Sequence, residues 1–111
     1  LSNEDVVDIK CGFYFTLVLT SNHEVYSCGN NHYGQLGRCT FEDFGLSIEL
    51  IEEISEITRI ECGDFHSICI DVNEDLFLFG GNEYGQLGFN TGGYNETTPT
   101  KHPSLSNIID I

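Results

Sequence analysis

The chain has 111 residues, of which 40% are hydrophobic, and its 18 acidic and 4 basic residues give a formal net charge of −14 at pH 7. This charge opposes contact with nucleic acid phosphates and anionic lipid headgroups, so we expect no direct nucleic acid binding by this segment. No apolar run approaches the roughly 20 residues of a membrane-spanning helix, and no signal-peptide pattern is present, so we expect no membrane association and an intracellular protein.

The first strongly patterned stretch runs from Val6 to Thr20 and is rich in β-branched and aromatic residues. Gly12 interrupts it, which predicts two short strands rather than one long strand. Residues 21–24 supply turn chemistry before a second apolar segment, so residues 15–29 predict a β-hairpin.

Three glycines and two asparagines follow between Gly29 and Gly37. This composition predicts a structured loop with positive φ angles, in which Tyr33 and Leu36 turn inward. Residues 48–51 alternate like an outer strand, whereas residues 52–57 alternatively predict a helical turn.

The sequence Tyr33-Gly34-Gln35-Leu36-Gly37 then returns unchanged at residues 84–88, an offset of 51 residues that needs no gap. Residues 6–56 and 57–107 are therefore two repeats, and residues 108–111 match the beginning of a third. In the second repeat, residues 71–75 predict the hairpin turn, and the two prolines between residues 89 and 107 predict an edge strand or a loop.

A period near fifty residues is typical of a propeller or another repeat array, which usually needs about three or more units for stability. We therefore expect residues 1–111 to be part of such an array, a partial β-propeller or another repeat structure, and a piece of a longer protein. If each repeat is a propeller blade, its faces toward the missing neighbours should expose apolar residues, so self-association through these faces is possible.

Both repeats share a longer pattern. It begins with Ile-x-Cys-Gly, continues through the hairpin and ends with Gly-x-Asn-x-Tyr-Gly-Gln-Leu-Gly. This last segment begins at Gly29 in the first repeat and at Gly80 in the second. This pattern resembles the tandem repeats of the regulator of chromosome condensation family. The resemblance implies an all-β fold, a seven-bladed β-propeller whose blades each have four antiparallel strands. Phe15 stands where the family pattern and the second repeat (His66) have histidine, and Cys28 and Phe79 stand where tryptophan is common. We interpret these positions as packing positions.

We expect no catalytic, cofactor-binding or metal-binding residues. His66 and Ser67 are neighbours on a strand and should point to opposite faces, so they cannot act together with Asp64 as a catalytic group. The segment Asp71-x-Asn73-x-Asp75 lacks the glycine and the bidentate glutamate of a calcium loop. The glycines at positions 80, 81, 85 and 88 are followed by no lysine or helix that could bind a phosphate.

The five cysteines are an odd number without zinc-ligand spacing, so they predict neither a disulfide framework nor a metal site. Four of them lie in apolar, strand-like segments, where we expect small buried thiols. A reducing compartment, the cytoplasm or the nucleus, suits this usage best.

These observations favour a protein-interaction scaffold over an enzyme. The alternative is that the chain forms part of a guanine nucleotide exchange factor for a small GTPase such as Ran, as the resemblance implies for the founding member. The acidic surface keeps the protein soluble or, in the sharper interpretation, contacts a basic partner protein.

Overall fold

The computed structural model describes residues 5–31, 33–38, 44–81 and 96–102. Within these ranges the chain is all-β, with no helix and hence no candidate membrane-spanning helix. The eight strands are β1 (Val6–Cys11), β2 (Phe15–Thr20), β3 (Val25–Asn30), β4 (Phe44–Leu50), β5 (Ile57–Cys62), β6 (His66–Asp71), β7 (Leu76–Gly80) and β8 (Glu96–Lys101).

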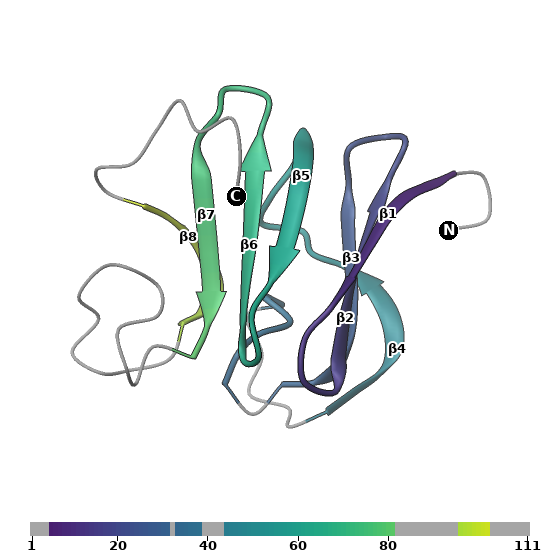
Figure 1. Ribbon diagram of the computed structural model, residues 1–111, viewed down its shortest axis with the longest axis vertical. Helices are drawn as coiled ribbons and strands as arrows, with labels where there is room; N and C mark the ends of the chain where they lie inside the picture. Colours follow the sequence, from purple (N-terminus) through teal and green to yellow (C-terminus); the bar gives the residue numbers. More distant parts are fainter. Residues whose placement is uncertain (1–4, 32, 39–43, 82–95, 103–111) are drawn as a thin grey trace.

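These strands form two antiparallel four-stranded sheets, with the orders β1-β2-β3-β4 and β5-β6-β7-β8. Each sheet is a meander in which neighbours in sequence pair in space, and the two sheets stand side by side (Figure 1). The predicted hairpin, outer strand and proline-containing edge strand are confirmed as β2–β3, β4 and β8. Pro103 and the end of the second repeat lie outside the described residues.

The helical turn considered for residues 52–57 is wrong, because residues 52 and 53 form a turn and β5 begins at Ile57. The N–H groups of Ile51 and Ile57 instead donate to the carbonyls of Val25 (2.8 Å) and His23 (2.9 Å), so the connection is held against the β2–β3 turn. Ile51, Ile54 and Ile57 are nevertheless buried together, which explains their helix-like spacing.

The two sheets also repeat each other's irregularities. The pairing of β1 with β2 shifts register at Val7, and the pairing of β5 with β6 shifts at Thr58. The hairpin turns place His23 and Glu74 at φ angles of 63° and 65°. Each of these pairs is separated by 51 residues, so the sequence repeat is a repeat of backbone geometry.

The main hydrophobic core lies between the two sheets. Its buried members come from both repeats and are Leu17, Leu19, Val25, Ile51, Ile54, Ile57, Ile60, Cys69 and Phe79. Each repeat therefore buries apolar side chains mainly against its neighbour, which is how repeat proteins are stabilised.

On the open side of the first sheet, which has no neighbouring described sheet, apolar side chains are exposed. Val6 and Ile9 on β1 are 47% and 54% exposed, whereas their counterparts Ile57 and Ile60 are 0% and 2% exposed. Cys11 is also exposed, which corrects the expectation of a buried thiol at that position. The cause is that β5 packs against β1 and β2 of the first sheet, whereas no described sheet packs against the open side of β1.

Candidate protein interface

The loop from Tyr33 to Gly37 is fixed by hydrogen bonds made by its own side chains. The amide of Gln35 donates from Nε2 to Asn30 Oδ1 (3.0 Å), and its Oε1 accepts the backbone N–H of Tyr33 (2.9 Å). Leu36 is fully buried, and its carbonyl accepts a hydrogen bond from Ser27 Oγ (2.9 Å). The loop is thus a rigid element of the first blade.

The same loop is clamped to the second blade. Ser67 Oγ on β6 donates to the carbonyl of Gln35 (2.9 Å), and both groups are buried. Gly37 has a φ of 64°, and a Cβ there would lie 2.7 Å from the buried ring of Phe79 on β7. The predicted positive φ is confirmed at Gly37, whereas Gly88 lies outside the described residues.

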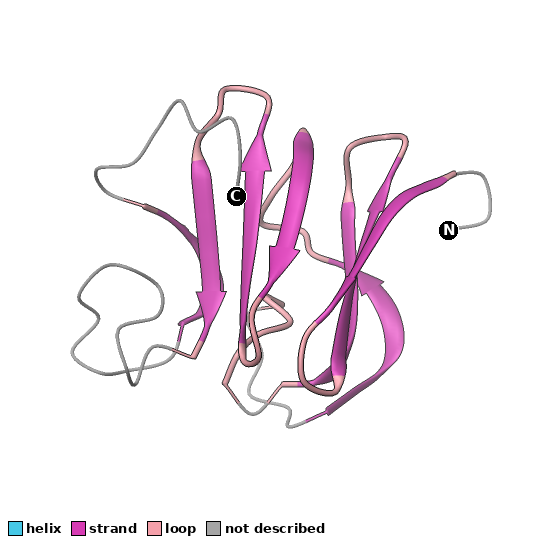
Figure 2. Ribbon diagram, in the orientation of Figure 1, coloured by secondary structure: helices cyan, strands magenta, loops and turns pink. Residues whose placement is uncertain are grey.

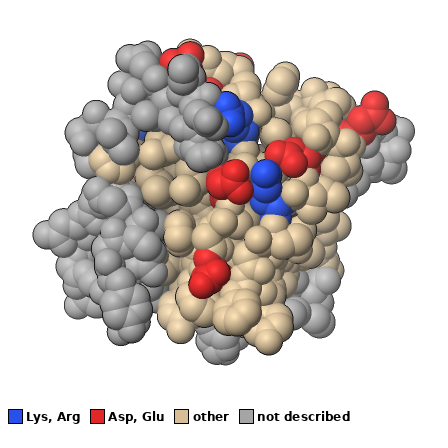
Figure 3. Space-filling view, in the orientation of Figure 1, with Lys and Arg blue, Asp and Glu red and all other residues tan. Residues whose placement is uncertain are grey.

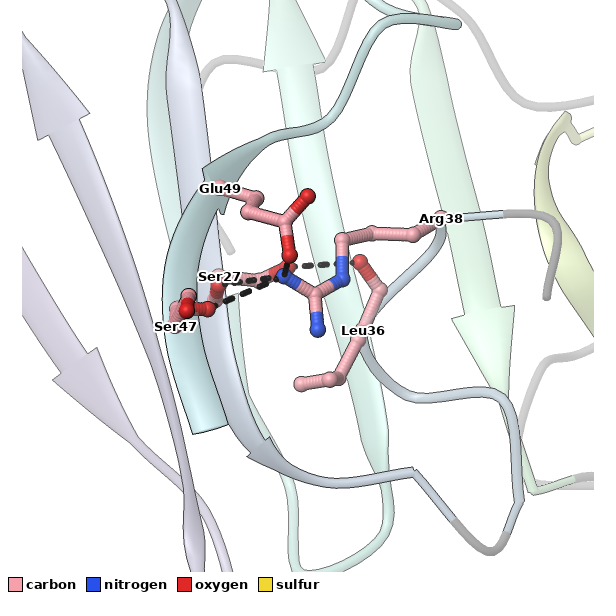
Figure 4. A network of polar contacts seen from close by, with 5 residues as sticks. All are labelled: Ser27, Leu36, Arg38, Ser47 and Glu49. Carbon is pink, nitrogen blue, oxygen red and sulfur yellow. Dashed lines mark hydrogen bonds and ion pairs between the residues drawn. The ribbon is translucent and has the colours of Figure 1, made fainter. Parts of the chain in front are cut away.

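Arg38 joins this loop to β3 and β4 (Figure 4). Its Nη1 donates to the carbonyls of Ser27 (3.3 Å) and Ser47 (3.1 Å) and lies 3.4 Å from Glu49 Oε2. The Arg38 side chain is 6% exposed, so this cation is a structural cross-link rather than a surface charge. The corresponding residue of the second repeat is Phe89, which is why the repeat comparison did not single out Arg38.

The residues considered for catalysis have separate structural contacts. Ser67 bonds to the loop, whereas the His66 imidazole lies against Gly63, where an added Cβ would be 2.0 Å from the ring. Phe15 fills the same slot over Gly12 in the first repeat, with a corresponding separation of 2.1 Å. Burial lowers the pKa of His66, and the nearby Asp64 opposes that shift only partly. Both repeats therefore use this position for packing.

The segment considered as a calcium loop is a hairpin turn. Asp71 Oδ1 accepts the backbone N–H groups of Asn73 (2.9 Å) and Asp75 (3.0 Å). In the part of the chain that the structure describes, no three His, Cys, Asp or Glu residues are grouped to hold a metal ion. Of the glycines considered for phosphate binding, Gly81 donates its N–H to the Phe65 carbonyl (2.8 Å), and those at positions 85 and 88 lie outside the described residues.

Two of the described thiols, those of Cys62 and Cys69, are poor nucleophiles at neutral pH. Burial, with smaller contributions from Cys11 and Glu61, raises the pKa of Cys62 to about 12, and burial also raises the pKa of Cys69. A thiol must lose its proton to attack an electrophile or bind a metal. These two cysteines therefore act as small hydrophobic residues.

The β1–β2 and β5–β6 turns lie at the lower end of the sheets in Figure 1, and they meet through the Phe13 N–H and the Asp64 carbonyl. Exposed and half-buried aromatic rings of these turns and of the neighbouring loop contact one another. We call Tyr14, Phe13, Phe65 and Tyr33, in this order, the aromatic row. Phe13 stacks on Tyr14 (5.0 Å between centroids, 13° between planes), Phe65 meets Phe13 edge-on (5.5 Å), and Tyr33 tilts against Phe65 (5.0 Å). Phe13 and Tyr14 remain 51% and 76% exposed.

The two described lysines are each paired with an acidic side chain. Lys10 lies 3.6 Å from Glu61 across the two blades, and Lys101 lies 3.3 Å from Asp75. On the face shown in Figure 3, blue side chains lie beside red ones and form no continuous basic area. The described surface thus offers aromatic groups and an excess of acidic side chains.

Comparison with known proteins gives a consistent result. The chain matches the regulator of chromosome condensation (RCC1) repeat, with one description of this repeat covering residues 6–35 and 57–86 and a second covering residues 22–70 and 73–111. The chain belongs to the regulator of chromosome condensation repeat family. The predicted family and the all-β propeller fold are thereby confirmed.

Relatives within this repeat family include proteins of different kinds. The chain is 40% identical to "Protein RCC2 homolog" of Danio rerio over 94 residues, which are 84% of this chain and 19% of that protein. It is 35% identical to "Probable E3 ubiquitin-protein ligase HERC4" of Homo sapiens, over 81% of this chain and 9% of that protein. The chain thus spans less than a fifth of these relatives, and the matched region of the ligase is a small part of it.

Solved structures with the same repeats superimpose well. Yeast RCC1 (Prp20), in a structure bound to Kap60, gives a TM-score of 0.83 at 17% identity, covering 89% of this chain and 25% of that chain. Human WBSCR16 gives a TM-score of 0.73 at 32% identity, covering 88% of this chain and 26% of that chain. The first likeness shows the fold alone, and in both cases the match covers about a quarter of the solved chain.

Proposed function

We propose that this chain is a segment of a protein-interaction scaffold and that its aromatic row is the contact surface. The observation that carries the proposal is the exposure of Phe13 and Tyr14 in the β1–β2 turn, whose backbone is held by hydrogen bonds from the Phe13 N–H and to the Tyr14 carbonyl. Exposed aromatic groups on a rigid support are typical of protein-binding surfaces, because they bury much area at little entropic cost.

The chemistry of the described residues supports binding over catalysis. Ser67, His66 and the carboxylate of Asp71 are each engaged in structural contacts. A solved relative in the family, Prp20p of Saccharomyces cerevisiae, is described with binding properties to Gsp1p and histones. Protein partners are therefore the class of ligand that we propose for this chain as well. The odd number of cysteines supports an intracellular location, in the cytoplasm or nucleus.

A site-specific photocrosslinking experiment tests the scaffold. A benzophenone amino acid at position 13 should give defined adducts with partner proteins, whereas one at position 72, which is 48% exposed in the β6–β7 turn at the opposite end, should not give the same adducts. Identical adducts from both positions would show non-specific contact and contradict the proposal.

The same protein also separates the scaffold from the exchange-factor alternative. Release of a fluorescent nucleotide from Ran should proceed at its intrinsic rate when this chain is added. An acceleration that depends on the concentration of the chain would favour exchange activity over a scaffold.

A further inference from the structure

Tyr14 in the aromatic row has a backbone conformation that the second repeat does not copy. Tyr14 has a φ of 62°, in the left-handed region that disfavours residues with a Cβ. Its counterpart in the second repeat, Phe65, does not have a positive φ angle. Because the Tyr14 ring is 76% exposed, burial does not compensate the strain. His23 and Glu74 take the same angle in the β2–β3 and β6–β7 turns, so at Tyr14 it is a turn conformation, here at a residue with an exposed ring.

The turn that carries Tyr14 is nevertheless held firmly. The Tyr14 carbonyl accepts the N–H of Asn30 (2.7 Å), and the Phe13 N–H donates to the Asp64 carbonyl of the next blade (2.9 Å). The Phe65 carbonyl is engaged in the same way by Gly81. The rings are thus presented in a fixed arrangement before any partner binds, which lowers the entropic cost of binding.

The charges around the aromatic row favour a positively charged ligand. Asp64 is exposed in the β5–β6 turn, directly before Phe65 in the chain, and its carbonyl contacts the β1–β2 turn. The nearest cation in sequence, Lys10, is paired with Glu61, and the His66 imidazole lies against Gly63 rather than at the surface. The whole chain carries 18 acidic residues against 4 basic ones. An anionic ligand would be repelled, and a cationic one attracted.

We propose that the aromatic row binds an arginine side chain presented by a partner protein. The guanidinium is planar and weakly hydrated, so it can stack through a cation–π interaction on the outer face of Tyr14, whose other face is stacked on Phe13. The Asp64 carboxylate, in the neighbouring turn, attracts the cation electrostatically. This inference rests on the proposed scaffold function and adds the chemical class of the partner group.

Four capped five-residue glycine peptides test this class of ligand, each with one central residue: arginine, lysine, citrulline or norleucine. Binding to the whole chain is followed by NMR through the amide signals of the two β-turn residues Phe13 and Tyr14. We expect the arginine peptide to bind about 3 to 10 times more tightly than the isosteric but neutral citrulline peptide, which corresponds to about 0.7 to 1.4 kcal/mol. Added salt should reduce this difference.

Three variants locate the site. Tyr14→Gly removes the ring and suits the left-handed backbone, so it should fold with unchanged or higher thermal stability and yet lose at least about threefold in arginine affinity. Asp64→Asn should reduce the preference for arginine over citrulline. Val72→Ser, which removes an exposed apolar side chain from the β6–β7 turn, is the matched control and should bind like the parent.

Equal affinity for arginine and citrulline, or undiminished arginine binding by Tyr14→Gly, would overturn the inference. So would the absence of arginine-peptide binding at millimolar concentration. The scaffold proposal is tested separately, because position-specific crosslinks from residue 13 can persist when an arginine preference fails.

Discussion

Replacing Gly37 by valine probes the contact between the loop of the first blade and the second blade. Two costs follow from the structure. A residue with a Cβ at φ 64° is disfavoured by about 1 to 2 kcal/mol, and more for a β-branched side chain. The new Cβ would also lie 2.7 Å from the buried Phe79 ring, and overpacking of this kind typically costs about 1 to 3 kcal/mol. We expect a loss of about 2 to 5 kcal/mol in the free energy of unfolding.

Urea unfolding of the parent and the variant measures this loss. With a slope near 2 kcal/mol per molar, the midpoint should fall by about 1 to 2.5 M. The two costs can be separated, because asparagine tolerates the left-handed region but keeps the Cβ. Gly37→Asn should therefore retain mainly the steric part of the loss.

A double-mutant cycle tests the steric part directly. Phe79→Leu shortens the side chain that the new Cβ meets, so Gly37→Ala should cost less in that background than in the parent. If Gly37→Val unfolds at the parent's urea concentration, the clamp between loop and second blade does not exist as described. Strict additivity of Gly37→Ala and Phe79→Leu would remove the steric explanation and leave only the backbone cost.

Other consequences can be measured on the same chain. Ser67→Ala should cost about 1 to 3 kcal/mol in urea, because the buried Gln35 carbonyl loses its partner; a cost below 0.5 kcal/mol, roughly, would show that water replaces the hydroxyl. Burial lowers the pKa of His66 in the folded state, so its contribution to stability is complete above the unfolded pKa of about 6.5 and is lost as the pH falls through the folded pKa. His66→Phe, which copies Phe15, should flatten that part of the pH profile, and an unchanged profile would assign the acid sensitivity to other groups. Because the open face of β1 is apolar, sedimentation velocity should show self-association that rises with protein and salt concentration and weakens in Ile9→Lys; a monomer at every concentration would contradict this. Chelator should shift the melting temperature by less than about 5 °C, and a larger shift would reveal a bound metal.

The strand order was predictable because its determinants are local. The alternation of apolar residues around Gly12 and the turn residues 21–24 predict β1 to β3, and the exact repeat carries the same prediction to β5 to β7. The left-handed backbone at Gly37 was predictable for the same reason, since the loop composition alone demands it. Family membership followed from a long pattern found twice in register.

The candidate interface was not predictable from the sequence pattern, because it depends on how the two sheets pack. The aromatic row joins residues that lie in separate turns and a loop, so no local period connects Phe13 with Phe65 or Tyr33. A signal was present in the sequence, because the turn positions of Tyr14 and Phe65 are both aromatic and 51 residues apart. Their proximity depends on the packing of the sheets, which sequence periodicity does not determine.

Arg38 illustrates a second limit. The repeat comparison emphasises residues that occur twice, and Arg38 occurs only in the first repeat. Its contacts with Ser27 and Ser47 depend on how the loop returns beside β3 and β4. The exposure of Cys11 was missed for a related reason, since burial on an edge strand depends on the neighbouring sheet.

The clamp between the loop and the second blade also fixes an order of events during synthesis. Phe79 is made 42 residues after Gly37, so the first blade leaves the ribosome with its loop uncovered. At about 5 to 20 residues per second, that interval lasts about 2 to 8 seconds. During this interval the side of the loop that later contacts the Phe79 ring, and the Gln35 carbonyl that later binds Ser67, can contact only water or a chaperone. The loop of the first blade therefore gains its contacts only when the second blade has been synthesised. The speed of translation through β5 to β7 determines how long this loop remains uncovered.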